Sequence, residues 1–343
     1  MAIQFGWTKE GGIVDSNNRY FQEMQDKYNQ DFKVDSATMV QKRYEAMERI
    51  IVLNEYYPTN AQYILSVLQK GADEYEVLRM LDAVDLQLKD NKAYKRALSK
   101  IKFNAKRSKE VSNLSAFEWM NIAEWKTFKE AVAKDKKLID SVAKQTGVEG
   151  RLIVSCLVGE QIRLFNSSRE AYKKWIGPLK VLSVESQFSF GVTGIKEHTA
   201  MNIEHNLKDP SSIYYLGSEY EGLLDFVGQD TATINKERID RLTDFHNHYY
   251  SYMYAALFLK QVKVQWEKEG YPIDKRPEIL ATLFNVGYPQ SKPKPNPRVG
   301  GSTIKIYDKP YSFGAIAYQF YYSGELFEIF PFEKKKFDWN KKG

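Results

Sequence analysis

The stretch LIVSCLVGEQIRLF, residues 152–165, most strongly constrains the fold, because it predicts a buried helix that carries a carboxylate, Glu160. A charged glutamate on an apolar face is costly. The ordinary explanation is a glutamate at the end of a helix that reaches water, with Arg163 three residues further on as its partner. The alternative is a functional acid. At the helical period, four apolar side chains share the face of Glu160: Ile153, Cys156, Leu157 and Leu164.

Length and composition predict an ordered protein of about two domains at ~150 residues each. The chain has 343 residues, of which 43% are hydrophobic and 14% aromatic, whereas disordered chains are poor in aromatics. Cys156 is the single cysteine, so no disulfide forms within the chain. The four histidines show no zinc-binding spacing with cysteine or acidic partners. We therefore expect neither a catalytic metal nor a cofactor.

The N-terminal sequence MAIQFGWTKEGGIV lacks the basic start and apolar core of a secretory signal. No segment approaches the ~20 apolar residues that span a bilayer. We therefore expect a protein made in the cytoplasm without a general export signal.

The net charge of +6 is concentrated in a basic run over residues 92–109 that contains no acidic residue. Such a run is usually one solvated face of a helix, but it could also attract an anionic polymer such as teichoic acid, or an anionic membrane. No nucleic-acid-binding motif accompanies it, so nucleic acid is an unlikely partner. The basic residues are Lys92, Lys95, Arg96, Lys100, Lys102, Lys106, Arg107 and Lys109.

Helical periodicity predicts a mainly α protein with two parts. Residues 1–35 are polar and predicted to be irregular, and residues 36–145 read as successive helices that form a module of unknown role. The sequence TGVEG at 146–150 marks a shift, and residues 146–343 are predicted to form the second domain. Its expected helices include 197–207, a long stretch over 231–268, and 277–287 between Pro277 and Gly287. The proline-rich stretch after Gly287 predicts an extended basic loop.

Three short motifs, which follow one another along the second domain, resemble those of a known protein family. The helix with Glu160 comes first, then Gly191-Val192-Thr193-Gly194-Ile195-Lys196 followed by Thr199-Ala200, then Phe284-Asn285-Val286-Gly287. This order resembles the lysozyme-like fold of lytic transglycosylases and goose-type lysozymes, over residues ~148–325. In that family a helix ends in the catalytic glutamate, a G-A-x-G-L-M-Q loop and Thr-Ala follow, and Tyr-Asn-x-Gly comes later. Here Lys196 replaces the glutamine and Phe284 replaces the tyrosine.

The resemblance implies roles for these positions. Glu160 would be the general acid and base, and Gly191 and Gly194 would let the backbone approach a sugar. Asn285 would orient the acid or an N-acetyl group. The ordinary alternatives are a plain turn at the glycines and a helix C-cap at Asn285. Further substrate contacts are expected from Lys196, Phe284 and, on the last helix, Tyr318.

A second glutamate competes for the role of the acid. VESQF, residues 184–188, resembles the E-S-x-F that carries the glutamate in many lytic transglycosylases. However, Glu185 lies only a few residues before Gly191, which leaves little room for the usual connecting loop. We therefore expect Glu160 to be the acid, with Glu185 as a rival or a second carboxylate.

Glycosidic cleavage requires a proton on the leaving oxygen. Burial favours a protonated Glu160, whereas a close Arg163 would oppose it, so Arg163 is expected to point elsewhere.

The resemblance favours a lytic transglycosylase that cleaves the MurNAc–GlcNAc β-1,4 bond of peptidoglycan glycan strands. Such an enzyme could be a phage endolysin or a virion-associated lysin that acts on the cell wall. The alternatives are a hydrolysing muramidase, with Glu185 or Asp209 as second carboxylate, and a non-catalytic structural protein that retains a lysozyme-like fold.

Overall fold

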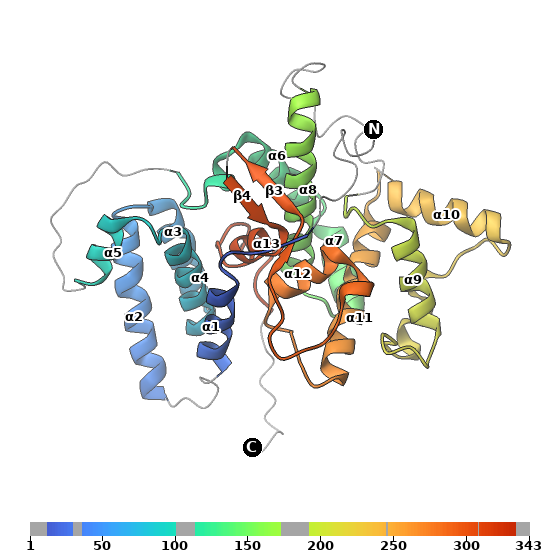
Figure 1. Ribbon diagram of the computed structural model, residues 1–343, viewed down its shortest axis with the longest axis horizontal. Coiled ribbons are helices and arrows are strands. Elements are labelled where there is room, and N and C mark those ends of the chain that lie inside the picture. Colours follow the sequence, from blue (N-terminus) through green and yellow to red (C-terminus); the bar gives the residue numbers. More distant parts are fainter. Residues whose placement is uncertain are drawn as a thin grey trace. The chain divides into compact units, whose positions relative to one another are not determined.

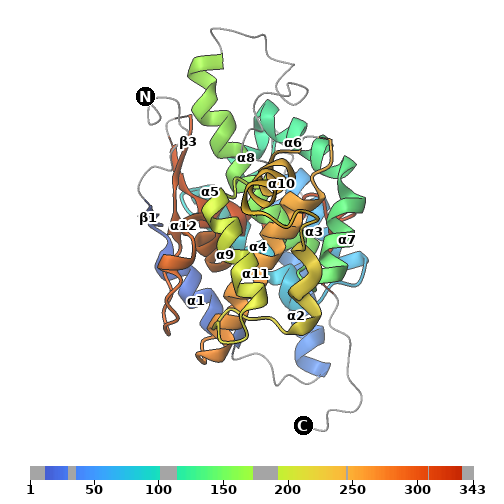
Figure 2. The same cartoon turned by 90° about the vertical axis from the view of Figure 1, so that its right-hand side faces the viewer.

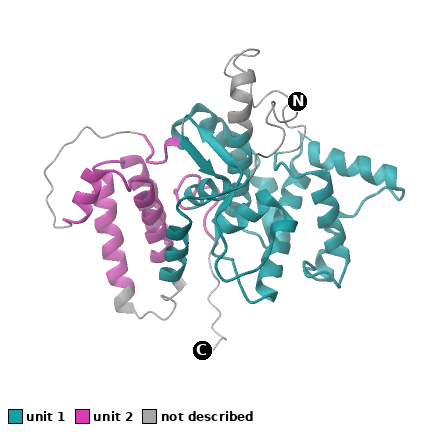
Figure 3. Cartoon of the chain, viewed as in Figure 1, with its two compact units in different colours: residues 1–33, 119–321 teal, residues 34–118, 322–343 magenta. Residues whose placement is uncertain are grey.

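The computed structural model describes residues 12–29, 36–100, 114–172, 192–244, 246–307 and 309–333, without the side chains at 29, 36–38 and 164–172. The chain forms two compact units, each discontinuous in sequence (Figure 3). Unit 1 comprises residues 1–33 and 119–321, and unit 2 comprises residues 34–118 and 322–343. The described residues are mainly helical, which confirms the predicted α-rich class.

Unit 2 contains the first four of the helices predicted for residues 36–145. Local sequence sets where they begin: Pro58 opens one helix, and the side chains of Asp73 and Asn91 accept hydrogen bonds from backbone N–H groups at the start of two others. Buried Arg49 binds Asp82 at 2.7 Å between two of these helices. The helices are α2 (Ser36–Asn54), α3 (Pro58–Gln69), α4 (Glu74–Gln87) and α5 (Lys92–Leu98).

The basic run begins on α5, where buried Tyr94 faces the unit and Lys92, Lys95, Arg96 and Lys100 are exposed. This part of the run is therefore a solvated helix face. The remaining basic residues, Lys102 to Lys109, lie outside the described residues.

Unit 1 is built around two long helices, α8 (Gly150–Tyr172) and α11 (Tyr249–Lys268) (Figures 1 and 2). Helix α8 packs against α6, α7, α12 and α13, and α11 packs against α7, α9, α10 and α12. The other helices are α1 (Asn18–Asn29), α6 (Ala123–Lys134), α7 (Lys136–Thr146), α9 (Glu197–Lys208), α10 (Thr231–Thr243), α12 (Pro277–Val286) and α13 (Phe313–Tyr321), with short 3-10 turns η2 (Glu118–Asn121), η3 (Ser218–Leu224) and η4 (Tyr288–Gln290).

Short strands complete unit 1. Strand β1 (Ile13–Val14) pairs antiparallel with β2 (Gly300–Gly301), with Ile13 opposite Gly301. Strands β3 (Thr303–Ile306) and β4 (Lys309–Ser312) form an antiparallel hairpin, and β3 lies against α8. The chain between α12 and α13 therefore returns to α8, which carries Glu160.

The N-terminal segment differs from the prediction. Residues 1–35 are predicted to be irregular, yet the described part contains β1 and α1. Polar side chains fix this segment: Ser312 Oγ donates to Asp15 at 2.7 Å, and the N–H of Val299 donates to Asn18 Oδ1 at 2.6 Å. These contacts come from residues almost 300 positions away, so local periodicity does not reveal them.

The predicted helix over 231–268 is divided into α10 and α11. The side chain of Asp244 accepts hydrogen bonds from the backbone N–H groups of His246 and Asn247, which is a local turn that competes with the helix. An aspartate turn inside a helical pattern explains the break.

The division into units also differs from the predicted boundary between residues 145 and 146. Helices α6 and α7 belong to unit 1, because α6 packs against α8 and α7 packs against α11. Gly147, with φ +68°, is the left-handed C-cap of α7. The glycine-rich sequence at 146–150 is therefore a helix cap inside unit 1.

None of the helices in the described ranges is both long enough and apolar enough to cross a membrane.

Candidate active site

Glu160 lies in the middle of α8, and its side chain is completely buried. The predicted buried helix is present, and it continues past Glu160 to Tyr172, so the ordinary explanation of a glutamate at a helix end that reaches water does not hold. The flanking Ile153, Cys156 and Leu157 are buried as predicted, and the side chain of Leu164 lies outside the description. A carboxyl group that does not reach water must be satisfied by protein groups.

Arg163 supplies the first of these groups. Its Nη2 and Nε both donate to Oε2 of Glu160, at 2.8 and 3.2 Å, and the Arg163 side chain is only 14% exposed. The prediction that Arg163 points elsewhere is therefore wrong. The physical reason is that a buried carboxylate needs a counter-charge, and the spacing of three residues places Arg163 within reach.

Asn285, near the end of α12, approaches the other oxygen. Its Nδ2 lies 3.4 Å from Oε1 of Glu160, a long hydrogen bond. Its Oδ1 accepts from the N–H of Ser302 at 2.8 Å and from Ser302 Oγ at 2.9 Å. A backbone N–H only donates, so Ser302 fixes which end of the amide faces Glu160. The cap of α12 is Gly287, whose N–H donates to Leu283, and not the Asn285 side chain.

Gly194 closes the third side of the carboxylate. It has φ +64°, and a Cβ at this position would lie 2.8 Å from Oε2 and 3.0 Å from Cδ of Glu160. Only glycine fits both the conformation and the space. We expected this glycine to let the backbone approach a sugar; the structure shows the backbone approaching the acid itself. Gly191 lies outside the described residues.

Two neighbours complete the glycine loop. Gln161, next to the acid, donates from Nε2 to the carbonyl of Val192 at 2.8 Å and so ties the loop to α8. Thr193 is 1% exposed, and its hydroxyl has no hydrogen-bond partner among the described residues. Buried hydroxyls normally have a partner, so Thr193 is an unsatisfied buried polar group next to Gly194.

Three other predicted contacts lie elsewhere in unit 1. Lys196 is exposed at the N-terminal cap of α9. Phe284 is buried, and its ring packs edge-on against Phe258 with centroids 5.7 Å apart. Tyr318 is buried on α13 against the ring of Phe21, at 4.9 Å. The described contacts therefore connect Glu160 with Gly194 and Asn285, whereas Phe284 and Tyr318 pack in the core.

Neither candidate for a second carboxylate is placed at Glu160 by the described residues. Asp209 follows the C-terminal end of α9, whereas the glycine loop precedes its N-terminal end. At 1.5 Å per residue, the length of α9 separates them by roughly 18 Å. Hydrogen bonds from Ser211 lower the pKa of Asp209, which is typical of a turn aspartate. Glu185 lies outside the described residues.

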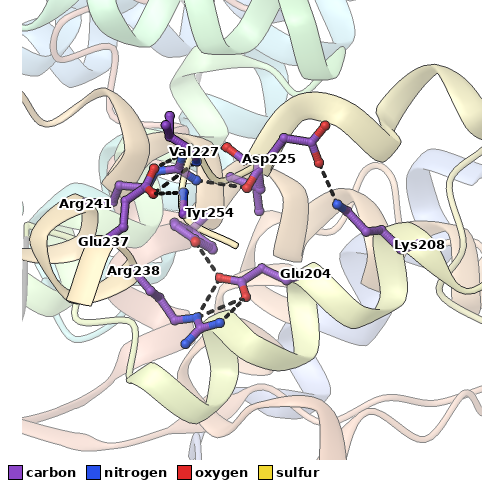
Figure 4. A network of polar contacts seen from close by, with 10 residues as sticks. Glu204, Lys208, Asp225, Val227, Glu237, Arg238, Arg241 and Tyr254 are labelled. Carbon is purple, nitrogen blue, oxygen red and sulfur yellow. Dashed lines mark hydrogen bonds and ion pairs between the residues drawn. The ribbon is translucent and has the colours of Figure 1, made fainter. Parts of the chain in front are cut away.

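A polar network holds α9, and with it the glycine loop, in place (Figure 4). Arg238 of α10 donates from Nε and Nη2 to Glu204 of α9, at 2.8 and 2.7 Å, and the hydroxyl of Tyr254 on α11 donates to the same carboxylate at 2.5 Å. Burial and the Glu204 carboxylate raise the pKa of Tyr254, so it stays a donor. Three helices are thus joined at one glutamate.

The second half of this network fixes the segment that leads into α10 (Figure 4). Arg241 donates to Glu237 at 2.7 Å and to the carbonyl of Asp225 at 2.6 Å, and Glu237 also accepts from the N–H of Val227 at 3.1 Å. Lys208 of α9 pairs with Asp225 at 2.5 Å. All these groups are used internally, which is typical of a structural network rather than a ligand site.

Two other chemistries receive no support from the described residues. Burial and the nearby Glu160 raise the pKa of the Cys156 thiol well above its usual range, so it is not a reactive thiolate. Within the described ranges, no group of three or more His, Cys, Asp or Glu side chains could hold a metal ion.

Sequence reasoning missed two of the groups around the acid. Ser302 orients the Asn285 amide by donating hydrogen bonds to its Oδ1. The local sequence Gly300-Gly301-Ser302 does not indicate that Ser302 contacts the end of α12. Gln161 could have been found, because a glutamine beside an acid on a buried helix needs a partner.

Comparison of the chain with family models, with curated proteins and with solved structures found no match.

Proposed function

We propose that this protein cleaves the glycan strands of peptidoglycan through a lysozyme-like domain, with Glu160 as the acid. One observation carries the proposal. Three sequence motifs, which resemble the lytic transglycosylase motifs in order and type, meet at one buried carboxylate through Gly194 and Asn285. Chance motif matches scattered over 125 positions would have no reason to converge on a single oxygen pair.

Glu160 would first protonate the glycosidic oxygen and then, as a carboxylate, accept a proton from the attacking hydroxyl. The first step needs the neutral acid, so the ion pair with Arg163 has to open when substrate binds. Asn285 would remain in place as the orienting group, because Ser302 holds its other end. The unpartnered hydroxyl of Thr193 would offer a hydrogen bond to the sugar or to a bound water.

Transglycosylase chemistry fits the single acid better than hydrolysis does. A hydrolase needs a second carboxylate or a positioned water, whereas the muramic acid's own 6-hydroxyl can attack within the substrate. Of the two candidates for the second carboxylate, Asp209 lies beyond the far end of α9 from the glycine loop, whereas Glu185 lies outside the described residues and stays open. The muramidase assignment is therefore the alternative. The cellular setting that fits is a phage endolysin or virion-associated lysin acting on the cell wall.

A non-catalytic protein with a retained lysozyme-like fold is the second candidate. The observation that favours it is the complete burial of Glu160 together with its ion pair to Arg163. A glutamate fixed in this way also serves as a structural bridge between α8, the glycine loop and α12.

Cleavage of purified peptidoglycan separates the two candidates. We expect wild-type protein to release soluble fragments and Glu160→Gln to lose about 10²–10⁴ in rate, because the amide has no proton to deliver. Asp82→Asn is the matched control, since it also removes a buried carboxylate from an arginine pair, but in unit 2. Comparable residual rates in both variants, or no cleavage by wild type, would favour the structural candidate.

A further inference from the structure

Helix α2 of unit 2 has a second apolar stripe besides the one that faces the core. Its buried side includes Ala46, Ile50 and Leu53. The second stripe comprises Val40, Tyr44, Met47 and Ile51, with exposed fractions of 54, 70, 36 and 44%.

These residues are spaced by four, three and four positions, the spacing of the a and d positions of a coiled coil. Single exposed apolar residues are ordinary, but four in one heptad frame are not a scatter. In this frame Val40 and Met47 take d positions, and Tyr44 and Ile51 take a positions. The stripe therefore has the pattern of a helix that packs against another helix.

The charges beside the stripe indicate which helix and in which direction. In the same frame Arg43 occupies a g position and Glu48 the following e position. Two parallel copies would place Arg43 of each chain against Glu48 of the other, whereas antiparallel copies would pair g with g and e with e. The side chain of Arg43 is 57% exposed, and its bond to Glu74 is long, at 3.3 Å, so it remains available.

We propose that α2 mediates a parallel, two-fold symmetric dimer of this chain, in which the stripe of one copy packs against the stripe of the other. Each residue of the stripe then meets its own equivalent, because the two-fold axis of a parallel helix pair runs along the interface. Two heptads bury less than the roughly 800 Å² per partner of a stable interface. The dimer is therefore weak and depends on concentration.

Cysteine cross-linking of the full chain tests the geometry. The single native cysteine, Cys156, is fully buried, so the unmodified protein is expected to form no disulfide-linked dimer and serves as the background control. Under mild oxidation Tyr44→Cys is expected to give a covalent dimer, because equivalent a positions face each other. Glu45→Cys is the control on an exposed position outside the stripe. Equal yields for both variants, or no dimer for either, would overturn the proposal.

Two further outcomes would also overturn it. Cross-linking only in a mixture of Tyr44→Cys with Met47→Cys would show antiparallel helices. A thiol at Tyr44→Cys that resists maleimide in dilute folded protein would show that the chain's own residues cover the stripe.

A charge exchange tests the pairing independently of the apolar contacts. Sedimentation equilibrium is expected to show dimerisation weakened roughly tenfold in Glu48→Arg, because two attractive pairs become repulsive. The double variant Arg43→Glu/Glu48→Arg is expected to restore the affinity to within about threefold of wild type, because it rebuilds both pairs in reverse. A double variant as weak as Glu48→Arg, or an affinity unchanged in both, would contradict the parallel arrangement.

Discussion

Asn285 and Glu160 are 125 positions apart in the sequence, yet the amide nitrogen of Asn285 lies 3.4 Å from Oε1 of the glutamate. The opposite end of the same amide is held by Ser302. The acid is thus oriented from a second helix, independently of the arginine on its own helix. If the Arg163 pair opens, the contact with Asn285 can still orient Glu160.

Gly194→Ala should lower the free energy of unfolding more than a left-handed backbone alone explains. Alanine at positive φ costs roughly 1 kcal/mol, and here its Cβ would also meet the Glu160 carboxylate. Gly270→Ala in the same unit is the matched control, because Gly270 has φ +83° with nothing within 4 Å of the added Cβ. Urea unfolding followed by circular dichroism provides the measurement. Equal losses in both variants would mean that the loop does not press on Glu160.

Arg163→Met should destabilise unit 1 by about 3–5 kcal/mol near neutral pH, because it leaves a buried carboxylate without its counter-charge. Arg163→Lys should recover most of this loss, because an ammonium group restores the positive charge near Glu160. Urea unfolding of the two variants measures the difference. Equal losses in both variants would indicate that the arginine contributes packing rather than charge.

Asp135 provides an acid-sensitive contact in unit 1. Burial raises the pKa of Asp135, but hydrogen bonds from His248 and Tyr252 outweigh this and lower it. Because the pKa of Asp135 is lower in the folded protein, ionised Asp135 stabilises the fold at pH values above about 4, the pKa in the unfolded chain. This stabilisation is lost as the pH falls through the pKa of Asp135 in the folded protein. Asp135→Asn should therefore cost about 2 kcal/mol near neutral pH and flatten the acid limb of the stability curve. Asp140→Asn, at a half-exposed aspartate paired with Lys136, is the control and should change the free energy of unfolding near neutral pH by less than about 1 kcal/mol.

A fragment of residues 146–343 should be much less stable than the full chain. It lacks α6 and α7, which pack against α8 and α11 and bury Trp125, Ile139 and Val142. A fragment that begins before Trp119 and ends near Tyr321 retains the described α6–α13 part of unit 1 and should unfold more cooperatively. Denaturant titration of the two fragments makes the comparison. Equal stabilities would show that α6 and α7 are dispensable for unit 1.

Local sequence signals predicted most of the helices. Pro277 and Gly287 bound α12, and the pattern over 197–207 locates α9 to within a residue. The boundary between units could not be predicted, because Gly147 marks a helix cap with the same residue type that marks a linker. The division of 231–268 depends on one aspartate side chain, which periodicity does not register.

At the candidate site, residue types were predictable but their contacts were not. A buried glutamate, a glycine and an asparagine in order indicate one site, and the structure brings Glu160, Gly194 and Asn285 together. Arg163 was predicted to point elsewhere, but a completely buried carboxylate needs a counter-charge, and Arg163 supplies it. Ser302 depends on where the chain returns after α12, which no local pattern encodes.

Mass spectrometry of the products released from purified peptidoglycan tests the central claim most directly. If Glu160 is the acid and the 6-hydroxyl the nucleophile, wild-type protein yields muropeptides that end in 1,6-anhydro sugar, lighter by one water than hydrolysis products, and Glu160→Gln yields almost none. Reducing-end products alone would make the protein a muramidase. Undiminished release by Glu160→Gln, with loss in Glu185→Gln, would contradict the account and assign the acid to Glu185.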